Sequence, residues 1–362
     1  MESLNIREGD GILLVRLGAL GDVVRTLPCV AALRESFPQA RLAWVVEPGS
    51  SSLLPGAPWL NEIVLFPRTA LGAPALWRHP NQARKALGQF LSKLQGFRPA
   101  LSLDFQGTAK SALIGKFSGA RRRLGFDRSG SRESSFLLNT IHVRPSSPRI
   151  NRVFKNLELL APLRVTAGPP KFPFPPVHPA RRISDFLTSL GDRIPVAVHP
   201  GTSLRQAHKR WPEESFGQVV HGLAEEGWAP ILTWGPGEET LVRRVLALSR
   251  GAGVAAPLTT PLEMRELIAS CRLFIGGDTG PMHLAWTQGV PVVVLFGSTD
   301  PSINGPLGDR HRILAPAWDG RHPFPRRGDR SVVRNIYPTA VLRAAREILH
   351  QCFIPPGRAP AP

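Results

Sequence analysis

The sequence has little cysteine and no long apolar run, and both absences limit what the protein can be. Its three cysteines, Cys29, Cys271 and Cys352, are far apart, and none belongs to a CxxC pair. We therefore expect neither a disulfide framework nor a cysteine-ligated zinc site, and a reducing compartment suits the chain. The first ten residues are too polar and acidic for a signal peptide, and no apolar run approaches the roughly 20 residues that span a bilayer. We expect a cytoplasmic protein that meets a membrane, the inner membrane, only peripherally.

Acidic residues are also scarce relative to basic ones. The 362 residues include 45 Lys and Arg against 27 Asp and Glu, a formal net charge of +18. Residues 1–165 hold 23 basic and 11 acidic groups, whereas residues 181–335 hold 18 and 15. The excess predicts an anionic partner for the first half: nucleic acid, a membrane surface or an acidic substrate. A genomic preference for arginine, which supplies 38 of the 45 basic residues, is the alternative.

Several motifs that identify common nucleotide, hydrolase and metal sites are missing as well. The chain has no Walker GxxxxGK[ST] and no GxSxG. None of its 11 aspartates forms a DxD pair, the usual cation ligand of metal-dependent sugar transferases. We therefore expect no metal and no resident cofactor. A single tyrosine and the lack of RRM or KH signatures argue against nucleic-acid binding despite the basic charge.

Short apolar segments rich in β-branched residues alternate with longer amphipathic ones. In the first half, strands are predicted over 11–17, 41–48, 62–67 and 99–107, and helices over 23–36 and 81–95. The same alternation resumes at residue 194. It predicts an α/β protein with parallel sheets and helices on both faces of each sheet.

Proline marks the division between the two halves. Residues 162–180 include seven prolines and cannot form a regular helix. We predict an N-terminal domain over 1–165, a proline-rich linker over 166–180 and a C-terminal domain over 181–335. A further helix is predicted over 338–351, and it could pack back on the first domain.

The turn after the first predicted strand is "RLGALGDVVRTLP", residues 16–28. Its glycines follow a GxxG spacing rather than GxGxxG, which disfavours an NAD site. Gly18 and Gly21 allow a tight turn and the close approach of a ligand. Asp22 stands at the start of the predicted helix, where it either caps the free N–H groups or acts as a general base. These residues alone leave both interpretations open.

A turn in the second half, "GGDTGPMHLAWTQGVP" at 276–291, is typical of a phosphate site. Ligands of such sheets bind at the carboxyl ends of the strands. Asp278, Thr279 and His283 lie where a strand is predicted to end and a helix to begin, so free N–H groups and the helix dipole favour a diphosphate there. A well-capped structural helix is the alternative.

Two more turns offer polar groups at predicted strand ends. In "HPGTSLRQAHKRWP" the hydroxyls of Thr202 and Ser203 and the ammonium of Lys209 suit a phosphate, unless the segment is only a solvated basic loop. In "TWGPGEE" either Glu238 or Glu239 could accept hydrogen bonds from ribose hydroxyls, although such a sequence also begins an ordinary helix.

These segments occur in an order that resembles one family, the ADP-heptose lipopolysaccharide heptosyltransferases of glycosyltransferase family 9. The matching segments are 12–47, "LDFQGTAKSAL" (103–113), "GFDRSGSRE" (125–133), "HPGT…KRWPEESF" (199–216), "TWGPGEE" and 277–301. The second and third are most similar to the heptosyltransferase I branch, whereas 48–98 and 140–180 match poorly. The resemblance implies the GT-B fold, in which two Rossmann-like doubly wound domains face a central cleft.

The resemblance also implies roles for individual residues. Asp22 would be the catalytic base, and Gly18 and Gly21 would form a glycine loop that clears room for the sugar. The residues that would bind the donor, ADP-heptose, are Thr202, Ser203, Lys209, Glu238, Asp278, Thr279, Gly280 and His283. No metal is implied, because cationic side chains and helix dipoles can neutralise a leaving diphosphate.

The activity that the resemblance implies is inverting, metal-independent transfer of heptose from ADP-L-glycero-D-manno-heptose to the Kdo and inner-core region of lipopolysaccharide. The acceptor would be an anionic lipid-linked oligosaccharide at the inner membrane, which fits the basic first half. We expect part of a basic cluster to bind it: Lys110, Arg121, Arg122, Arg123 and Arg132. The alternatives are a related transferase with another nucleotide sugar or another surface glycan, and a non-catalytic scaffold.

Overall fold

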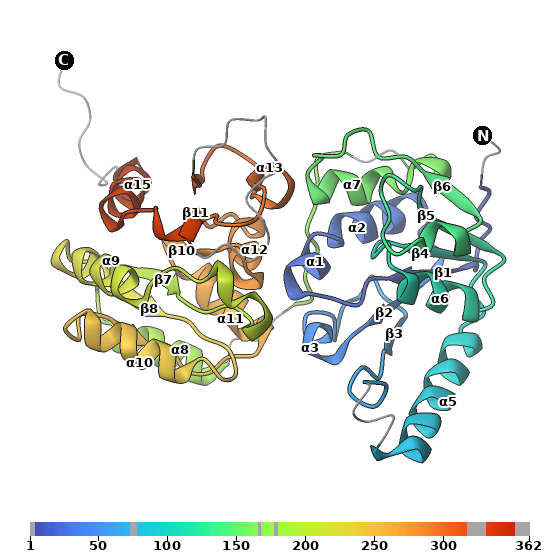
Figure 1. The fold of residues 1–362 in the computed structure, drawn as a ribbon, viewed down its shortest axis with the longest axis horizontal. Coiled ribbons are helices and arrows are strands. Elements are labelled where there is room, and N and C mark those ends of the chain that lie inside the picture. Colours follow the sequence, from blue (N-terminus) through green and yellow to red (C-terminus); the bar gives the residue numbers. More distant parts are fainter. Residues whose placement is uncertain (1–3, 73–77, 166–167, 177–179, 317–330, 352–362) are drawn as a thin grey trace. The chain divides into compact units, whose positions relative to one another are not determined.

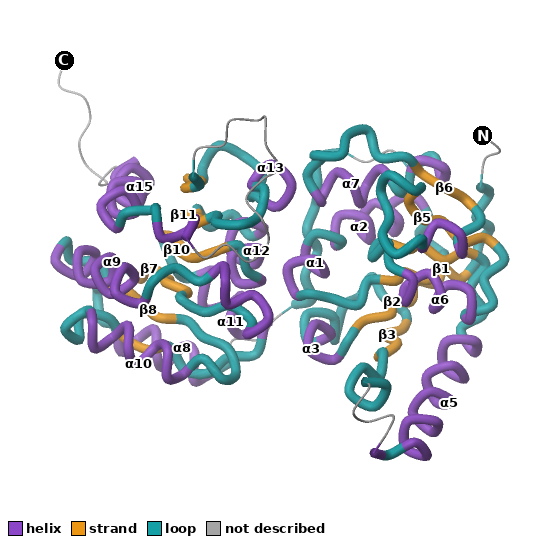
Figure 2. Tube along the Cα trace, in the orientation of Figure 1, coloured by secondary structure: helices purple, strands orange, loops and turns teal. Residues whose placement is uncertain are grey.

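The structure is a computed structural model that describes residues 4–72, 78–165, 168–176, 180–316 and 331–351 (Figure 1). The chain divides into two compact units, Met1–Pro176 and Val177–Pro362. Each unit is built on a parallel sheet of six strands, with helices between successive strands (Figure 2). The division falls within the proline-rich stretch, of which residues 166, 167 and 177–179 lie outside the described ones.

The sheet of the first unit has the strand order β3-β2-β1-β4-β5-β6. Its central strand is apolar throughout, and Ile12, Leu13 and Val15 are fully buried because helices cover both faces. The strands are β1 (Gly11–Val15), β2 (Arg41–Val46), β3 (Glu62–Leu65), β4 (Leu101–Asp104), β5 (Arg122–Phe126) and β6 (Ile141–Val143).

Helices α2 and α7 pack together on one side of this sheet, and α5 and α6 lie side by side on the other (Figure 1). Leu94 of α5 and Ile114 of α6 share a core with Leu13 and Val15 of β1. The helical elements are α1 (Leu20–Val24), α2 (Leu27–Ser36), α3 (Pro48–Ser51), α5 (Pro80–Gly96), α6 (Ala109–Phe117), η1 (Ser135–Leu138), α7 (Arg152–Glu158) and η2 (Ala161–Leu163).

The single helix predicted over 23–36 is wrong, because the chain forms two helices there. The first, α1, ends at Val24, and α2 begins at Leu27 with Pro28 in its first turn. Proline lacks an N–H and clashes with the preceding turn, so it starts a helix readily but does not continue one. The helix predicted over 81–95 is confirmed as α5.

The second unit repeats the arrangement with the strand order β12-β11-β10-β7-β8-β9. Its strands are β7 (Pro195–His199), β8 (Ala229–Leu232), β9 (Val254–Ala255), β10 (Leu273–Gly277), β11 (Val292–Leu295) and β12 (Arg312–Leu314). Its helical elements are α8 (Arg181–Ser189), η3 (Leu204–Lys209), α9 (Glu213–Glu225), α10 (Glu239–Leu248), α11 (Pro261–Ala269), α12 (Gly280–Thr287), α13 (Pro301–Asn304), α14 (Ser331–Arg334) and α15 (Pro338–Gln351).

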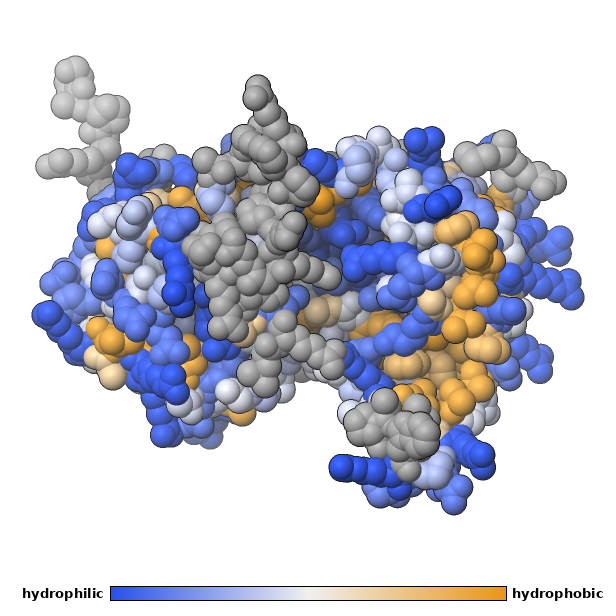
Figure 3. All heavy atoms as spheres, in the orientation of Figure 1, coloured by the Kyte–Doolittle hydropathy of each residue, from blue (hydrophilic) through white to orange (hydrophobic). Residues whose placement is uncertain are grey.

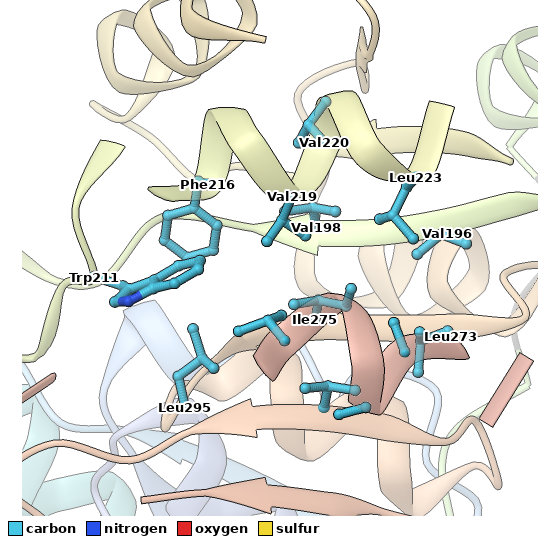
Figure 4. Close-up of a cluster of buried hydrophobic side chains, with 14 of the residues drawn as sticks. Val196, Val198, Trp211, Phe216, Val219, Val220, Leu223, Leu273, Ile275 and Leu295 are labelled. Atoms are coloured by element: carbon cyan, nitrogen blue, oxygen red, sulfur yellow. The ribbon is translucent and has the colours of Figure 1, made fainter. Parts of the chain in front are cut away.

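The core of the second unit fixes the segment that carries Lys209. Trp211 packs edge-on against Phe216 with ring centroids 5.0 Å apart, and Val219 of α9 lies on the same cluster (Figure 4). The indole N–H of Trp211 also donates to the backbone oxygen of Ile336 at 3.0 Å. A loop that begins at the end of β7 is therefore anchored at its far end by a buried aromatic pair.

The suggestion that helix 338–351 packs on the first domain is wrong, because α15 packs within the second unit. Its apolar positions Val341, Ala345 and Ile348 belong to the same buried cluster as the residues of α9. The guanidinium of Arg346 donates to Glu226, just after α9, at 2.7 Å. Among the described residues, no helix is both long and apolar enough to cross a bilayer.

Candidate active-site residues

Asp22 lies in the first turn of α1, just after the carboxyl end of β1. Its carboxylate accepts a hydrogen bond from the backbone N–H of Ala19 at 3.3 Å, so Asp22 does cap the start of α1. It also forms ion pairs with Arg16 and Arg25, each at 2.6 Å. About 25% of the side chain is still exposed, so the carboxylate is accessible to a ligand.

The electrostatics of Asp22 are dominated by its cationic neighbours. Burial alone would raise the pKa of this carboxyl, but Arg16 and Arg25, assisted by Arg152, hold the pKa well below its usual range. Asp22 is therefore ionised at every physiological pH. A carboxylate with so low a pKa is ready to accept a proton but is a weak base as long as these charges are uncompensated.

Helix α7 carries two further cations, of which Arg152 acts on Asp22 and Lys155 acts on Arg152. Burial and the charge of Arg16 lower the pKa of Arg152 to about 10. Burial and the charges of Arg152 and Arg132 lower the pKa of Lys155 to about 8. The Lys155 ammonium donates to the backbone oxygen of Gly130 at 2.6 Å and lies 4.4 Å from the ring centroid of Phe126. Cations this close together disfavour one another, as expected of a site that binds an anion.

Helix α7 is held in place by a contact with the junction of α1 and α2. The side-chain amide of Asn156 donates to the backbone oxygen of Arg25 and to the hydroxyl of Thr26, both at 3.1 Å. Asn151 caps the start of the helix by accepting from the N–H of Val153 at 3.0 Å.

We call Arg16, Arg25, Arg132, Arg152 and Lys155 the cationic ring. Of these five residues, only Arg132 was predicted from the sequence. An asparagine that can cap a helix, followed by Arg152 and Lys155 three residues apart, could have indicated two cations on one side of a helix.

The predicted acceptor cluster divides into two groups. The backbone N–H of Arg132 donates to the oxygen of Gly107 at 2.8 Å, which puts this segment beside the carboxyl end of β4. Lys110 lies at the same edge, where its ammonium pairs with Glu47 at 3.2 Å and stands over the ring of Phe66. Arg121, Arg122 and Arg123 do not join them, because they precede or begin β5 and so lie at the opposite edge of the sheet.

Two of those three arginines are bound to backbone oxygens. Arg123 donates to Leu138 and Ala120, at 2.9 and 3.0 Å, and Arg122 donates to Asn5 at 3.2 Å. Successive residues of a strand point to opposite faces, so an Arg-Arg pair entering β5 cannot act as a single patch.

The glycine loop has a packing role in this structure. A Cβ on Gly18 would lie 3.0 Å from the hydroxyl of Ser50 in α3, so a larger residue would press on that helix. The backbone oxygen of Gly21 accepts from the guanidinium of Arg25 at 3.2 Å. Both glycines therefore support the elements that surround Asp22.

In the second unit, Asp278 is the centre of a buried polar network. One carboxylate oxygen accepts from the ammonium of Lys209 and from the hydroxyl of Thr299, both at 2.9 Å. His283 Nε2 lies 3.7 Å from the other oxygen, while His283 Nδ1 accepts from the indole N–H of Trp286 at 3.0 Å. The Trp286 bond fixes the ring with its Nε2 hydrogen toward Asp278.

Lys209 lines a small cavity with residues from three strand ends. Its lining includes His199, Gly201, Thr202, Gly277 and Thr279. The hydroxyl of Thr202 is buried without a hydrogen-bond partner in the described part of the chain, whereas Ser203 is exposed. Buried hydroxyls are normally satisfied, so Thr202 is poised for a group that the protein does not supply.

Helix α12 begins at the same cavity. Thr279 is its N-cap residue, yet the hydroxyl makes no capping bond and donates instead to the oxygen of Gly277 at 3.3 Å. Gly280 is the first helical residue, and Pro281 follows it. An N-terminus without a side-chain cap leaves backbone N–H groups to be satisfied by an anion.

The carboxylate of Glu238 lies beside the end of β7 and is held there by the backbone of its own turn, which follows β8. Its carboxylate accepts from the N–H of Gly235 at 2.8 Å and lies 4.0 Å from Nε2 of His199. A Cβ on Gly201 would approach a Glu238 oxygen to 2.2 Å, so a larger residue there would displace the Glu238 carboxylate. Within the described ranges, no group of three or more His, Cys, Asp and Glu side chains forms a potential metal site.

Comparisons with known proteins identify the family and the fold of the chain. Lipopolysaccharide heptosyltransferase 1 of Pseudomonas aeruginosa PAO1 is 26% identical over 310 residues, which cover 82% of this chain and 81% of that protein. A glycosyltransferase family 9 structure from Veillonella parvula superposes with a TM-score of 0.77 at 20% identity, covering 95% of this chain and 99% of that one.

The structure of Escherichia coli heptosyltransferase WaaC with ADP superposes with a TM-score of 0.72 at 21% identity, covering 93% and 99% of the two chains. These likenesses confirm the GT-B fold with a Rossmann-like sheet in each unit. The profile of glycosyltransferase family 9 (heptosyltransferase) matches residues 90–323. The chain therefore belongs to glycosyltransferase family 9, the heptosyltransferases, and is a glycosyltransferase.

Proposed function

We propose that the protein transfers a heptose from ADP-heptose to an anionic acceptor of the lipopolysaccharide core, with inversion at the anomeric carbon and without a metal. The observation that carries the proposal is the accessible, permanently ionised carboxylate of Asp22 inside the cationic ring. Relatives named as lipopolysaccharide heptosyltransferases support the choice of donor and acceptor. The proposal assigns the acceptor to the domain over 1–165 and the donor to the domain over 181–335.

In the donor half, the groups around the Lys209 cavity would bind ADP. The Lys209 ammonium, the Thr202 hydroxyl and the free N–H groups at Thr279 and Gly280 suit the diphosphate. Glu238 would accept hydrogen bonds from the ribose hydroxyls. Because Asp278 is already saturated by its neighbours, we infer that it positions Lys209 and His283 rather than touching the ligand. These charges would stabilise the departing diphosphate without a cation.

In the acceptor half, Asp22 would take the proton of the acceptor hydroxyl as its oxygen attacks the anomeric carbon. The bond from that carbon to the β-phosphate oxygen breaks in the same step, and its electron pair leaves with ADP. Asp22 alone is a weak base, because Arg16 and Arg25 hold its pKa low. An anionic group bound by Arg132, Arg152 and Lys155 would offset these charges and raise the pKa of Asp22. Basicity would then appear only when the acceptor is present.

The proposal is tested by measuring ADP release and product mass with ADP-heptose and a Kdo-bearing lipid A acceptor. We expect turnover that persists in EDTA and that needs the acceptor. An unrelated nucleotide sugar used equally well would contradict the donor assignment and support another transferase of the same fold. Tight, salt-sensitive binding to random DNA without transfer would instead support a nucleic-acid-binding protein. ADP binding with no transfer to any acceptor would support a non-catalytic scaffold.

A further inference from the structure

The outer face of the first unit carries large apolar side chains that no part of the described chain covers. Phe117, at the end of α6, is 51% exposed, and Leu137 in η1 is 73% exposed. Leu113 of α6, Leu87 of α5 and Leu65 of β3 are also exposed. Single exposed apolar residues are ordinary, but a contiguous set marks a contact surface.

These side chains belong to elements that are neighbours. Helix α6 packs against both α5 and η1, and α5 packs against β3. The side-chain amide of Gln95 in α5 donates to the backbone oxygen of Phe117 at 3.2 Å, and Lys93 donates to that of Ile63 at 3.1 Å. Figure 3 shows the corresponding apolar band across the α5 and α6 region, bordered by hydrophilic side chains.

Helix α6 has two distinct faces. Its inner face is buried and consists of Ser111, Ala112, Ile114 and Gly115. Its outer face presents Lys110, Leu113, Lys116 and Phe117, so apolar and cationic side chains alternate on the surface. The core does not require Leu113 or Phe117, because both point away from it. Leu113 and Phe117 are therefore available to a surface outside the chain, with cationic side chains beside them.

Charge complementarity identifies the partner. Residues 80–125 contain nine Lys and Arg, and their one acidic residue is Asp104, which is 2% exposed. The exposed charges that this segment itself contributes are therefore all cationic, and two of them, Lys93 and Lys110, pair with Glu62 and Glu47 of neighbouring segments. Juxtaposed lysines and arginines attract anionic phospholipids, each contributing to binding within a Debye length of the surface.

A cationic cavity adjoins the Phe117 end of this face. The cavity has a volume of about 650 Å³, and both Gln95 and Ser118 line it. Its other lining residues include five arginines and one acid: Arg7, Arg41, Arg98, Arg121, Arg122 and Asp10. The carboxylate of Asp10 accepts from the backbone N–H of Arg7 at 2.8 Å. Guanidinium groups bind phosphate oxygens two at a time, so the cavity suits a phospholipid headgroup.

We propose that the face formed by α5, α6 and η1 docks on an anionic phospholipid bilayer. Leu87, Leu113, Phe117 and Leu137 enter the boundary between headgroups and acyl chains, while the surrounding lysines and arginines bind lipid phosphates. The carboxyl edge of the sheet, where α6 begins, then lies near the membrane surface together with Lys110 and Arg132. The inference goes beyond the proposed transfer reaction and depends only on the surface of the first unit.

The test is flotation of the full-length protein with vesicles, measured without donor or acceptor. We expect binding to vesicles of phosphatidylethanolamine and phosphatidylglycerol, weak binding to phosphatidylcholine, and a fall in binding as salt increases. The variant L113D/F117D should reduce the partition coefficient at least tenfold. Its matched control is L248D/L258D, which places the same charges at exposed leucines of the second unit and should bind within twofold of the wild type.

A second variant, R84E/K116E, keeps the apolar side chains and reverses the charges of two exposed cations, each three residues from an exposed leucine on its own helix. It should reduce binding to the anionic vesicles and leave the weak binding to phosphatidylcholine unchanged. Thermal unfolding and ADP binding of every variant verify that it folds.

Three outcomes would overturn the inference. Equal binding of L113D/F117D and the control would show that the face does not contact lipid. Equal binding of the wild type to both vesicle types would exclude recognition by charge. A wild-type dimer that L113D/F117D converts to a monomer would assign the face to a second copy of the chain. Transfer to a water-soluble acceptor, measured separately, reports on the proposed function, so either claim can fail while the other stands.

Discussion

Asp22 and Asp278 both lie at strand-to-helix turns, one in each unit, yet the structure uses them differently. Each follows a buried strand and stands at or near the start of a helix. Asp22 is about 25% exposed and its partners are two guanidinium groups, whereas Asp278 is 9% exposed and holds Lys209, Thr299 and His283. The role of an aspartate at a strand-to-helix turn therefore depends on the side chains that it binds. The first is available for chemistry, and the second organises other groups.

The largest expected effect is that of D22N on turnover. Asparagine keeps the size of the side chain and its acceptor for the Ala19 N–H, but it cannot take a proton. Loss of a general base typically costs 10²–10⁴-fold in rate. We expect a fall of about that size in kcat, with the Kd for ADP unchanged within twofold, measured by steady-state ADP release and calorimetry. A D22N enzyme that retains more than a tenth of the wild-type kcat would reduce Asp22 to a helix cap.

D278N should affect binding and stability instead. Removing the charge leaves Lys209, which is 12% exposed, without its ion-pair partner. Breaking a buried pair by removing one partner costs about 3–5 kcal/mol, and the partial exposure here places the expected loss of unfolding free energy near ~3 kcal/mol. The Kd for ADP should rise at least tenfold, because Lys209 loses its fixed position. Chemical denaturation and calorimetry measure both quantities, and T299V, which removes one hydrogen bond to Asp278 and keeps the ion pair with Lys209, is the milder control.

A pH profile distinguishes the binding of the acceptor at the cationic ring from the binding of ADP at the donor site. Lys155 has a pKa of about 8, so its ammonium is charged below that pH and loses its proton as the pH rises through it. If the charge binds the acceptor, kcat/KM for the acceptor should fall about tenfold between pH 7 and pH 9, while ADP affinity stays level. K155R stays protonated over this range and should remove the fall. An unchanged alkaline limb in K155R would exclude Lys155 as its source.

The smallest expected effect is at the buried hydroxyl of Thr202. T202V keeps the shape and removes the hydroxyl, whereas T202S keeps the hydroxyl. One hydrogen bond contributes about 0.5–1.5 kcal/mol, so T202V should raise the Kd for ADP about three- to tenfold. T202S should bind ADP as the wild type does. Equal affinities for all three proteins would mean that this hydroxyl does not meet the nucleotide.

Sequence patterns predicted the parts of this molecule that depend on local physics. The alternation of apolar and amphipathic segments predicted two parallel sheets, because strand and helix periods are local properties. The positions of Asp22, Lys209 and Asp278 in turns that follow strands were also predicted, since such turns are local signals, and their roles stay predictions.

What the sequence did not predict depends on contacts between distant segments. Arg152 acts on Asp22, and Lys155 on Arg152, across a contact in which Asn156 binds Arg25 and Thr26, about 130 positions away. The run of three arginines at 121–123 looked like one patch, but strand geometry sends Arg122 and Arg123 to opposite faces, and Arg121 and Arg122 line a cavity without Arg123. The break between α1 and α2 was predictable from Pro28, and the packing of α15 was not, because it depends on contacts with the distant helix α9.

The central claim is that Asp22 serves the chemical step and Asp278 serves donor binding. Single-turnover transfer by D22N and D278N, with donor raised to saturation for each, tests it most directly. The account predicts that D22N binds the donor normally and transfers at least a hundredfold more slowly, whereas D278N needs more donor but then transfers within tenfold of the wild-type rate. Normal single-turnover rates in D22N, or the same defect in both variants, would contradict the account.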